Sequence, residues 1–383
     1  MVEQKRILIM EYSNSSSSSN SVRRINLCSE LANQGLKVDV ISNISEYDSI
    51  NELYRISYNT SIKYLSMCLN KLLSFFFLYS DFLTFLSWRY KNKIKHVLKK
   101  NKYDSIIICV APYSLMQLAD FLRKRTSAKL ILDQCDPLGY NITYQIRKSK
   151  YRMSKYRKFE FRYLKKFDLI IVLNNRIKDV YEKTDLGLKS KIIVIEQGFK
   201  PIKSFSNKIK KNNQNGNIKI KALYAGYFYN NIREPYELYK ALSHFKNIEL
   251  NIIGEERNCF RIAECSINFL GRKKHDEVVL HSLNSDFLIF IDNFKGLQIP
   301  GKLFEIIAMG IPVIYIYENQ CGCDEYGIEC KYIYKAKNNK NSIINAINNI
   351  LLHLDEEVII NEDINKYSWC NLVKNKLLPI LFK

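Results

Sequence analysis

The chain has 383 residues, of which 47% are hydrophobic and 25% are charged, and its formal net charge is +21. This length predicts two domains, and the ordinary balance of residues excludes collagen-like, disordered and polytopic membrane proteins. The charge suits nucleic acid, an anionic membrane or a phosphorylated substrate, but abundant Lys, Asn, Ile and Tyr also arise from an A/T-rich genome without selection for binding.

The first residues run directly into a short apolar strand, which predicts a cytoplasmic protein without a signal peptide. The ten cysteines are scattered and form no disulfide-type framework, so we expect them to be reduced. Cys321, Cys323 and Cys330 form the one cluster in the sequence. That cluster lacks a second Cys-x-x-Cys pair or a nearby histidine, and the sequence therefore predicts no metal site.

The first half of the chain alternates strand and helix patterns, which is typical of a parallel sheet covered by helices. Strands are expected at 6–10, 37–41, 105–110, 129–132, 169–173 and 191–195. Helices are expected at 20–34, 53–100, 113–125 and 151–166. Gly35 follows the first of these helices and suits a helix C-cap.

A segment rich in Lys, Asn and Ser, residues 200–216, has the composition of a linker. Beyond it, strands are expected at 219–225, 249–253, 267–270, 287–291 and 312–317, and helices at 235–244, 275–283, 302–309 and 342–354. We therefore predict an α/β protein of two facing, doubly wound, Rossmann-like domains, 1–199 and 217–365, with 366–383 packing back on the first. Such folds bind ligands at the carboxyl ends of the strands, here in a cleft between the domains.

Loops that contain glycine follow three strands of the second half, at Gly226, Gly254 and Gly271. A fourth loop ends at Gly301 and opens the helix that carries Lys302. Glycine allows a close approach of backbone to a ligand, and amides at a helix N-terminus can bind phosphate. A cation in the first turn of a helix is unfavourable unless an anion lies in front of it.

Glu305 lies one turn after Lys302 and shares its helix face. A carboxylate in this position can accept two hydrogen bonds from a vicinal diol such as ribose. Arg233 follows Gly226 by one short loop and can reach a diphosphate as a charge-assisted donor. The combination predicts a site for a nucleoside diphosphate.

The segment 297–314 resembles the donor-binding signature of glycosyltransferases with the GT-B fold, and the family 4-like group is the closest match. That signature is Pro-x-Lys-x-x-Glu followed by small-x-Gly-x-Pro-Val-Ile, and residues 300–314 match it almost throughout. The loops at 224–226 with Arg233, at 251–255 and at 269–272 resemble the family's other donor loops. The resemblance covers the second half well and is weaker in the first half, where 133–136 and 193–201 are similar to the family's equivalents.

The resemblance implies a role for each matching residue. Glu305 would bind the donor ribose, Lys302 and Arg233 the diphosphate, and the amides of Gly301 to Leu303 the distal phosphate. Gly226 belongs to the first diphosphate loop, and Arg272 to the loop that faces the base. Family members generally need no metal, so the resemblance implies a UDP- or GDP-linked donor and no further cofactor.

Two positions depart from the family pattern. Leu297 stands where retaining members often carry a second glutamate, eight residues before the ribose-binding one. Cys135 stands where many members carry a histidine before an aspartate. Asp136 is the remaining candidate for the catalytic acid or base, and a turn residue before Pro137 is the alternative for it. The stereochemical outcome is left open.

The resemblance implies a glycosyltransferase that extends a lipid-linked saccharide or related acceptor in bacterial surface or secreted polysaccharide synthesis. The segments 65–100 and 147–166 combine aromatic and basic residues, as expected of peripheral contact with the inner face of the membrane; a buried domain helix is the alternative for 65–88. A nucleotide-sugar 2-epimerase of the same fold is a second candidate. A basic nucleic-acid-binding protein is a remote one, because no recognised binding motif is present.

Overall fold

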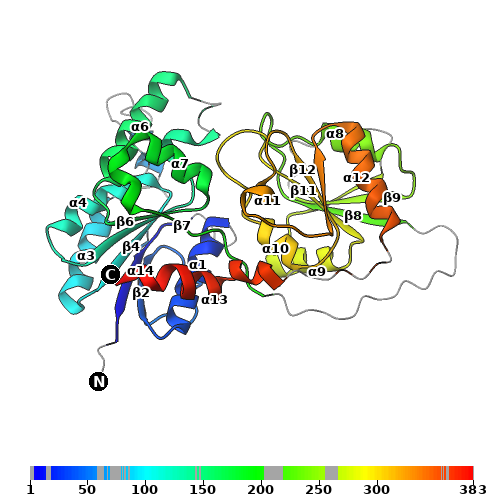
Figure 1. Cartoon of the computed structure of the whole chain (residues 1–383). Helices are drawn as coiled ribbons and strands as arrows, with labels where there is room; N and C mark the ends of the chain where they lie inside the picture. Colours follow the sequence, from blue (N-terminus) through cyan, green and yellow to red (C-terminus); the bar gives the residue numbers. More distant parts are fainter. Residues whose placement is uncertain are drawn as a thin grey trace. The chain divides into compact units, whose positions relative to one another are not determined.

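The computed structural model consists of two compact units, Met1–Gln197 together with Trp369–Lys383, and Gly198–Ser368. It describes residues 4–382 except 14–18, 58–63, 67, 70–78, 80, 82, 85–86, 143–144, 146–147, 202–218, 255–265, 355, 357 and 359–361. Each unit contains one parallel β-sheet covered by helices (Figure 1). The predicted fold class, two Rossmann-like α/β domains, is therefore confirmed.

Unit 1, as we call the first of these, contains a seven-stranded sheet in the order β3-β2-β1-β4-β5-β6-β7. The strands are β1 (Arg6–Met10), β2 (Lys37–Ser42), β3 (Glu52–Arg55), β4 (Ser105–Val110), β5 (Lys129–Gln134), β6 (Leu169–Val172) and β7 (Ile192–Val194). Every registered pair in this sheet is parallel. The fully buried runs of β1 and β4 are almost wholly apolar, as expected of strands covered by helices on both faces.

The helices of unit 1 that precede the crossing to unit 2 include α1 (Ser19–Asn33), α3 (Ser87–Lys100), α4 (Leu118–Arg123), α6 (Lys150–Leu164) and α7 (Asn175–Thr184). Side-chain caps define two of these starts. Ser149 accepts from the amide of Arg152 before α6, and Asn174 accepts from the amide of Ile177 before α7. Such caps satisfy amides that have no partner within the helix.

The long helix predicted at 53–100 is wrong in its first part. Glu52–Arg55 instead forms β3, which pairs in parallel with β2. Residues 64–66 and 68–69 are helical as predicted, and α3 covers Ser87–Lys100. The predicted helix at 113–125 also begins as a 3₁₀ turn, Tyr113–Gln117, before α4. Most of the apolar stretch 65–88 lies outside the described residues.

Unit 2, as we call the second, contains a six-stranded parallel sheet in the order β10-β9-β8-β11-β12-β13. The strands are β8 (Ile220–Ala225), β9 (Ile248–Ile253), β10 (Ser266–Gly271), β11 (Phe287–Ile291), β12 (Val313–Tyr317) and β13 (Ile333–Lys337). The helices are α8 (Tyr236–Leu242), α9 (His275–Leu283), α10 (Leu303–Ala308), α11 (Gly322–Glu325) and α12 (Lys340–Leu352). β13 and α11 have no counterpart among the predicted elements.

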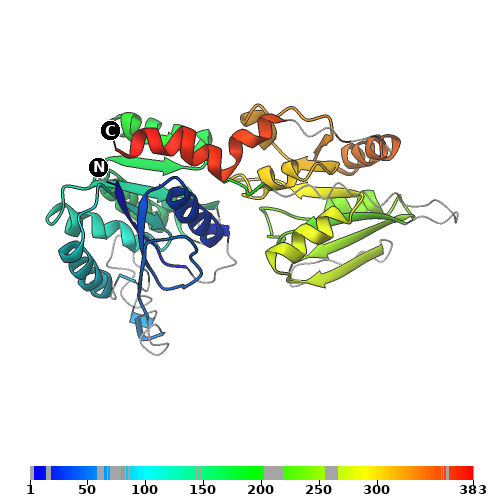
Figure 2. The same ribbon diagram turned by 90° about the horizontal axis from the view of Figure 1, so that it is seen from below.

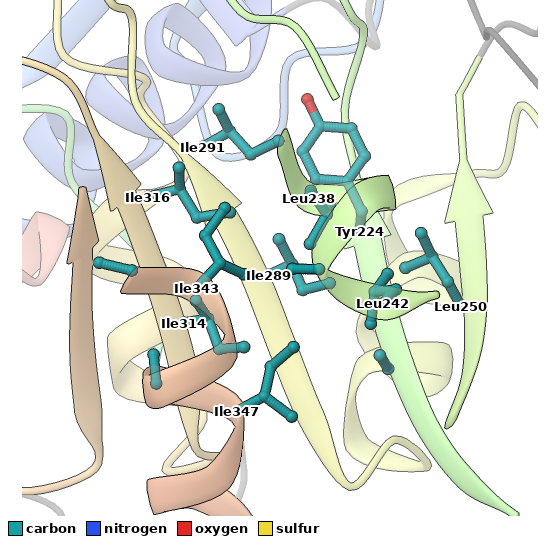
Figure 3. Packing of buried hydrophobic residues seen from close by; sticks show 14 of the residues in the cluster. Tyr224, Leu238, Leu242, Leu250, Ile289, Ile291, Ile314, Ile316, Ile343 and Ile347 are labelled. Atoms are coloured by element: carbon teal, nitrogen blue, oxygen red, sulfur yellow. The ribbon is translucent and has the colours of Figure 1, made fainter. Parts of the chain in front are cut away.

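One face of this sheet packs against α8 and α12. Figure 3 shows Ile289, Ile314 and Ile316 of the sheet beside Ile343 and Ile347 of α12, and all five belong to one buried cluster. The other face packs against α10, whose Leu303, Phe304 and Ile307 are buried in a second cluster. Apolar side chains on one side of α10 therefore fix its position on the sheet, while Glu305 stays partly exposed.

The C-terminal segment belongs to unit 1, not to unit 2. Its helical turns α13 (Trp369–Leu372) and α14 (Leu378–Leu381) run along α1, as Figures 1 and 2 show in red and blue. Trp369, Leu372 and Leu377 pack in the same buried cluster as Leu27 and Leu31 of α1. After the chain crosses back from unit 2, residues from Trp369 onward thus pack on the sheet of unit 1.

Within the described part of the chain, the helices are too short or too polar to cross a bilayer. The predicted linker 200–216 lies outside the described residues except at its first two positions.

Candidate nucleotide-sugar site

The three glycine loops of unit 2 lie side by side at the carboxyl ends of β8, β9 and β10. The amide of Gly226 donates to Ile253 O at 2.9 Å, and the amide of Gly254 donates to Gly271 O at 3.1 Å. A Cβ on Gly254 would stand 2.1 Å from Gly226 O, so no side chain fits there. Gly271 has a φ of +70°, a conformation that favours glycine. The sheet edge therefore presents closely packed backbone to the space in front of it.

A pocket at this edge brings Lys302 and Glu305 together with Ala225 of the first glycine loop. Its lining is completed by apolar and hydroxyl side chains from four elements, including Leu223, Val278, Ser282, Ile306 and Met309. The Lys302 ammonium donates to Ala225 O at 3.4 Å. The two charged residues of the sequence motif and the first glycine loop, which are about 80 positions apart in the chain, thus share one pocket.

Lys302 is exposed as a residue, but its side chain lies against the wall of the pocket and is partly desolvated there. This desolvation lowers the pKa of Lys302, with the positive charge of Arg233 as a further lowering cause and the charge of Glu305 opposing both. The positive charges of Lys302 and Arg233 repel each other. An anion placed between them would raise the pKa of Lys302 again and would be bound more tightly for that reason.

Asn293 holds the guanidinium of Arg233. Its side-chain oxygen accepts from Arg233 Nη2 at 2.8 Å, and its Nδ2 donates to Gln298 O at 2.9 Å. The backbone amide of Asn293 donates to the carboxylate of Asp292 at 2.7 Å. Asp292 is buried and also accepts from Tyr315 Oη at 2.7 Å. A chain of hydrogen bonds therefore ties Arg233 to the end of β11 and to Tyr315 in the middle of β12.

Glu305 has a second neighbour that the sequence did not indicate. His275, the first residue of α9, places Nε2 3.0 Å from Glu305 Oε1. This hydrogen bond is the leading cause that raises the pKa of His275, with the charges of Glu305 and Asp276 adding to it and desolvation and the charge of Lys302 opposing. The sequence predicts a helix at 275–283 and gives its first residue, His275, no role in the site.

The remaining predicted donor residues lie around this pocket in different ways. Arg272 is exposed after β10, with its guanidinium 5.5 Å from the centre of the Tyr227 ring. Gly301 precedes α10, which begins one residue later than predicted, at Leu303. The Leu303 amide already donates to Pro300 O at 3.2 Å, so a phosphate would have to compete for it.

Asp136 belongs to unit 1, in the loop after β5. Its backbone oxygen accepts from Tyr113 Oη at 3.0 Å, and its side chain is half-buried. The loop that follows is held by Glu160 of α6, which is fully buried and accepts from the amides of Leu138 at 2.5 Å and Gly139 at 2.9 Å. Buried hydrogen bonds to Glu160 thus hold the backbone that directly follows Asp136.

The cysteine cluster shows no arrangement for a metal. Cys321 and Cys323 are buried, and a hydrogen bond from Cys323 lowers the pKa of Cys321. Among the described residues, His, Cys, Asp and Glu side chains form no group of three or more that could hold a metal ion.

Three functional candidates were missed by sequence reasoning: His275, Asn293 and Glu160. Glu160 carries the clearest signal, because it is the one carboxylate in the basic helix 150–164 and lies between two phenylalanines. Asn293 follows a buried strand at its carboxyl end, a position that commonly faces a ligand. His275 has no such signal, since its contact depends on how α9 packs beside α10.

No protein-family model matches the sequence, and a search of curated proteins finds no match. Solved structures do match across nearly the whole chain. A sucrose-phosphate synthase from Thermosynechococcus elongatus is 14% identical with a TM-score of 0.67, and the match covers 99% of both chains. A glycosyltransferase from Rickettsia africae is 16% identical with a TM-score of 0.63, covering 99% of this chain and 98% of that one.

A putative UDP-N-acetylglucosamine 2-epimerase from Listeria monocytogenes is 12% identical with a TM-score of 0.54, covering 97% of this chain and 94% of that one. The chain therefore has the two-domain fold that these proteins share. At this level of identity the similarity concerns the fold, and the chemistry has to be argued from the site.

Proposed function

We propose that this chain is a glycosyltransferase whose nucleoside-diphosphate sugar donor binds at Lys302 and Glu305 of unit 2. One observation carries the proposal: the cation Lys302, whose charge is opposed by that of Arg233, shares a pocket with Glu305 and the first glycine loop at the carboxyl ends of parallel strands. A diphosphate would neutralise both cations. The Glu305 carboxylate, one turn away, would accept from the two ribose hydroxyls.

The proposed mechanism uses these groups to stabilise the departing nucleotide. Negative charge grows on the diphosphate as the bond to the sugar breaks, and two fixed cations stabilise that charge more in the transition state than in the bound donor. Asn293 contributes by holding Arg233, so the guanidinium needs little reorganisation during the reaction. We propose that no metal is needed, because these side chains supply the positive charge.

The proposal assigns the acid or base role to Asp136, in the loop supported by Glu160. Leu297 cannot serve as an acid at the position where the related glycosyltransferases often carry a glutamate.

A thermal-shift screen with UDP-, GDP- and CMP-sugars tests the donor site. At a concentration of about 100 times its dissociation constant, a donor should stabilise the protein by about 2.7 kcal/mol, a readily measured rise in melting temperature. We expect a UDP- or GDP-sugar to give this rise and the matching free monosaccharide to give none. Absence of any shift across the panel would contradict the proposal.

Product analysis with donor alone distinguishes transfer from epimerisation. A 2-epimerase converts the donor to its epimer without an acceptor, and the shared fold of a putative epimerase makes this the principal rival. We expect no epimerised donor, and at most slow release of free sugar. Accumulation of the epimer would establish the rival.

We further propose that the acceptor is a lipid-linked saccharide reached by peripheral contact with an anionic membrane. Trp88 at the start of α3 is 53% exposed and Tyr151 at the start of α6 is 61% exposed, and both helices carry several exposed lysines. Aromatic and basic residues together favour an anionic interface.

Co-sedimentation with phosphatidylglycerol vesicles tests this contact. The wild-type protein should pellet with these vesicles and not with phosphatidylcholine vesicles. The double substitution Trp88→Ala and Tyr151→Ala should reduce the bound fraction several-fold. Leu352→Ala, which removes a strongly exposed apolar side chain from unit 2, should leave the bound fraction unchanged. Equal binding to neutral and anionic vesicles would contradict the proposal.

A further inference from the structure

The contact between His275 and Glu305 joins two elements that are distant in sequence. His275 begins α9 and Glu305 lies in α10, and their side chains are 56% and 21% exposed. One carboxylate oxygen, Oε1, is 3.0 Å from the imidazole Nε2. An ionised carboxylate has two oxygens and about four acceptor positions, so Oε2 can still accept from a ligand.

The charged groups around His275 come from three places. Glu305 faces it from α10, Lys302 acts on it from the residue just before α10, and Asp276 is its neighbour on α9. Lys274 precedes His275 and Glu277 lies two residues after it, and the Glu277 carboxylate accepts from the Lys274 amide at 2.9 Å. The balance raises the pKa of His275, so the imidazolium persists to higher pH than it would in an unfolded chain.

We propose that His275 is a positioning residue for the donor site, which holds the Glu305 carboxylate in place as an imidazolium and leaves its second oxygen to the donor ribose. This inference rests on the proposed function. A carboxylate that is already ordered loses less side-chain freedom when the ligand binds. The imidazolium also adds a third positive charge near the proposed diphosphate.

The sign of the pH dependence follows from which form of His275 favours the donor. The imidazolium is present below the raised pKa of His275 and is lost as the pH rises through it. Donor affinity should therefore be highest at the acidic end and should fall as His275 loses its proton. The expected fall is about threefold to tenfold, the size of ordering one side chain.

Isothermal titration with UDP-glucose and with GDP-mannose, from about pH 5 to about pH 8, tests the inference. Neither sugar nucleotide titrates in this range, because each phosphate of its diphosphate is esterified. In the wild type the dissociation constant should rise with pH. In His275→Gln it should be independent of pH and close to the wild-type value at the alkaline end.

His353→Gln is the matched control, because His353 also pairs with a glutamate, Glu356, on the surface of unit 2 and outside the pocket. It should keep the wild-type profile. The inference is overturned if the wild-type affinity rises with pH, because His275 would then compete with the ligand for Glu305. It is also overturned if His275→Gln keeps the pH profile of the wild type. Failure of both sugar nucleotides to bind the wild type would instead count against the proposed function itself.

Discussion

Glu305→Ala should weaken nucleotide-sugar binding by about 100-fold or more and reduce turnover accordingly. A hydrogen bond to a charged group contributes about 1.5–3 kcal/mol, and the proposed site loses two of them with this carboxylate. Because each 1.4 kcal/mol corresponds to a factor of ten, the loss is at least about 100-fold. The dissociation constant of the best donor from the thermal-shift screen, measured by titration calorimetry, checks this value.

Two further variants make the result specific. Glu305→Gln keeps the shape of the side chain and removes its charge, so its affinity should lie between those of the wild type and Glu305→Ala. Glu356→Ala removes the other histidine-paired glutamate of unit 2 and should bind like the wild type. Melting temperatures within a few degrees of the wild type would show that the fold is kept. Wild-type affinity in Glu305→Ala would refute the site.

The second large effect concerns stability, at the buried ion pair between Arg23 of α1 and Asp133 of β5. The two side chains are 1% and 0% exposed, and the closest contact, Nη2 to Oδ1, is 3.0 Å. Arg23 also donates to Glu196 O at 2.7 Å and lies over the ring of Trp369. Burial disfavours its charge, but the carboxylate of Asp133 offsets this, and the net effect raises the pKa of Arg23.

Asp133→Ala should destabilise unit 1 by about 3–5 kcal/mol, because it leaves a buried cation without its partner. Tryptophan fluorescence during urea unfolding measures this unit selectively, since both tryptophans of the chain, Trp88 and Trp369, belong to it. Asp120→Ala breaks an exposed pair with Lys166 and should cost no more than about 1 kcal/mol.

A double substitution separates the charge effect from a packing effect. Arg23→Met together with Asp133→Leu removes both charges and should recover much of the lost stability, as uncharged replacements of buried pairs often do. Nucleotide-sugar binding by unit 2 should persist in these variants while unit 2 remains folded. Equal stability of Asp133→Ala and the wild type would show that the pair contributes little.

The periodic part of the fold was predictable from the sequence. The apolar runs of β1, β4 and β11 and the glycines at the carboxyl ends of β8, β9 and β10 indicate a doubly wound protein without reference to any long-range contact. The strand β3 was not predictable in this way, since Glu52–Arg55 has only four residues, carries a charge at each end and becomes a strand by pairing with β2. Pairing of this kind is a tertiary effect that local propensity does not encode.

Some residues of the site could likewise be predicted from the sequence and others could not. Lys302 and Glu305 are one turn apart, so helical periodicity alone places them on one face. His275 reaches Glu305 from a different helix, and Asn293 reaches Arg233 across a loop. Both contacts depend on how elements dock, which spacing in the sequence does not determine. The residues that support the recognised motif are therefore visible only in the folded chain.

The placement of Trp369–Lys383 on unit 1 makes unit 2 an insertion in an otherwise continuous domain. The chain leaves unit 1 after Gln197 and returns at Trp369, and the two crossing segments touch where the amide of Phe199 donates to Tyr367 O at 3.3 Å. During synthesis, all of unit 2 leaves the ribosome before unit 1 has its final helix. Unit 2 can thus fold first, whereas the hydrophobic surface of α1 is covered only after Trp369–Lys383 has been synthesised.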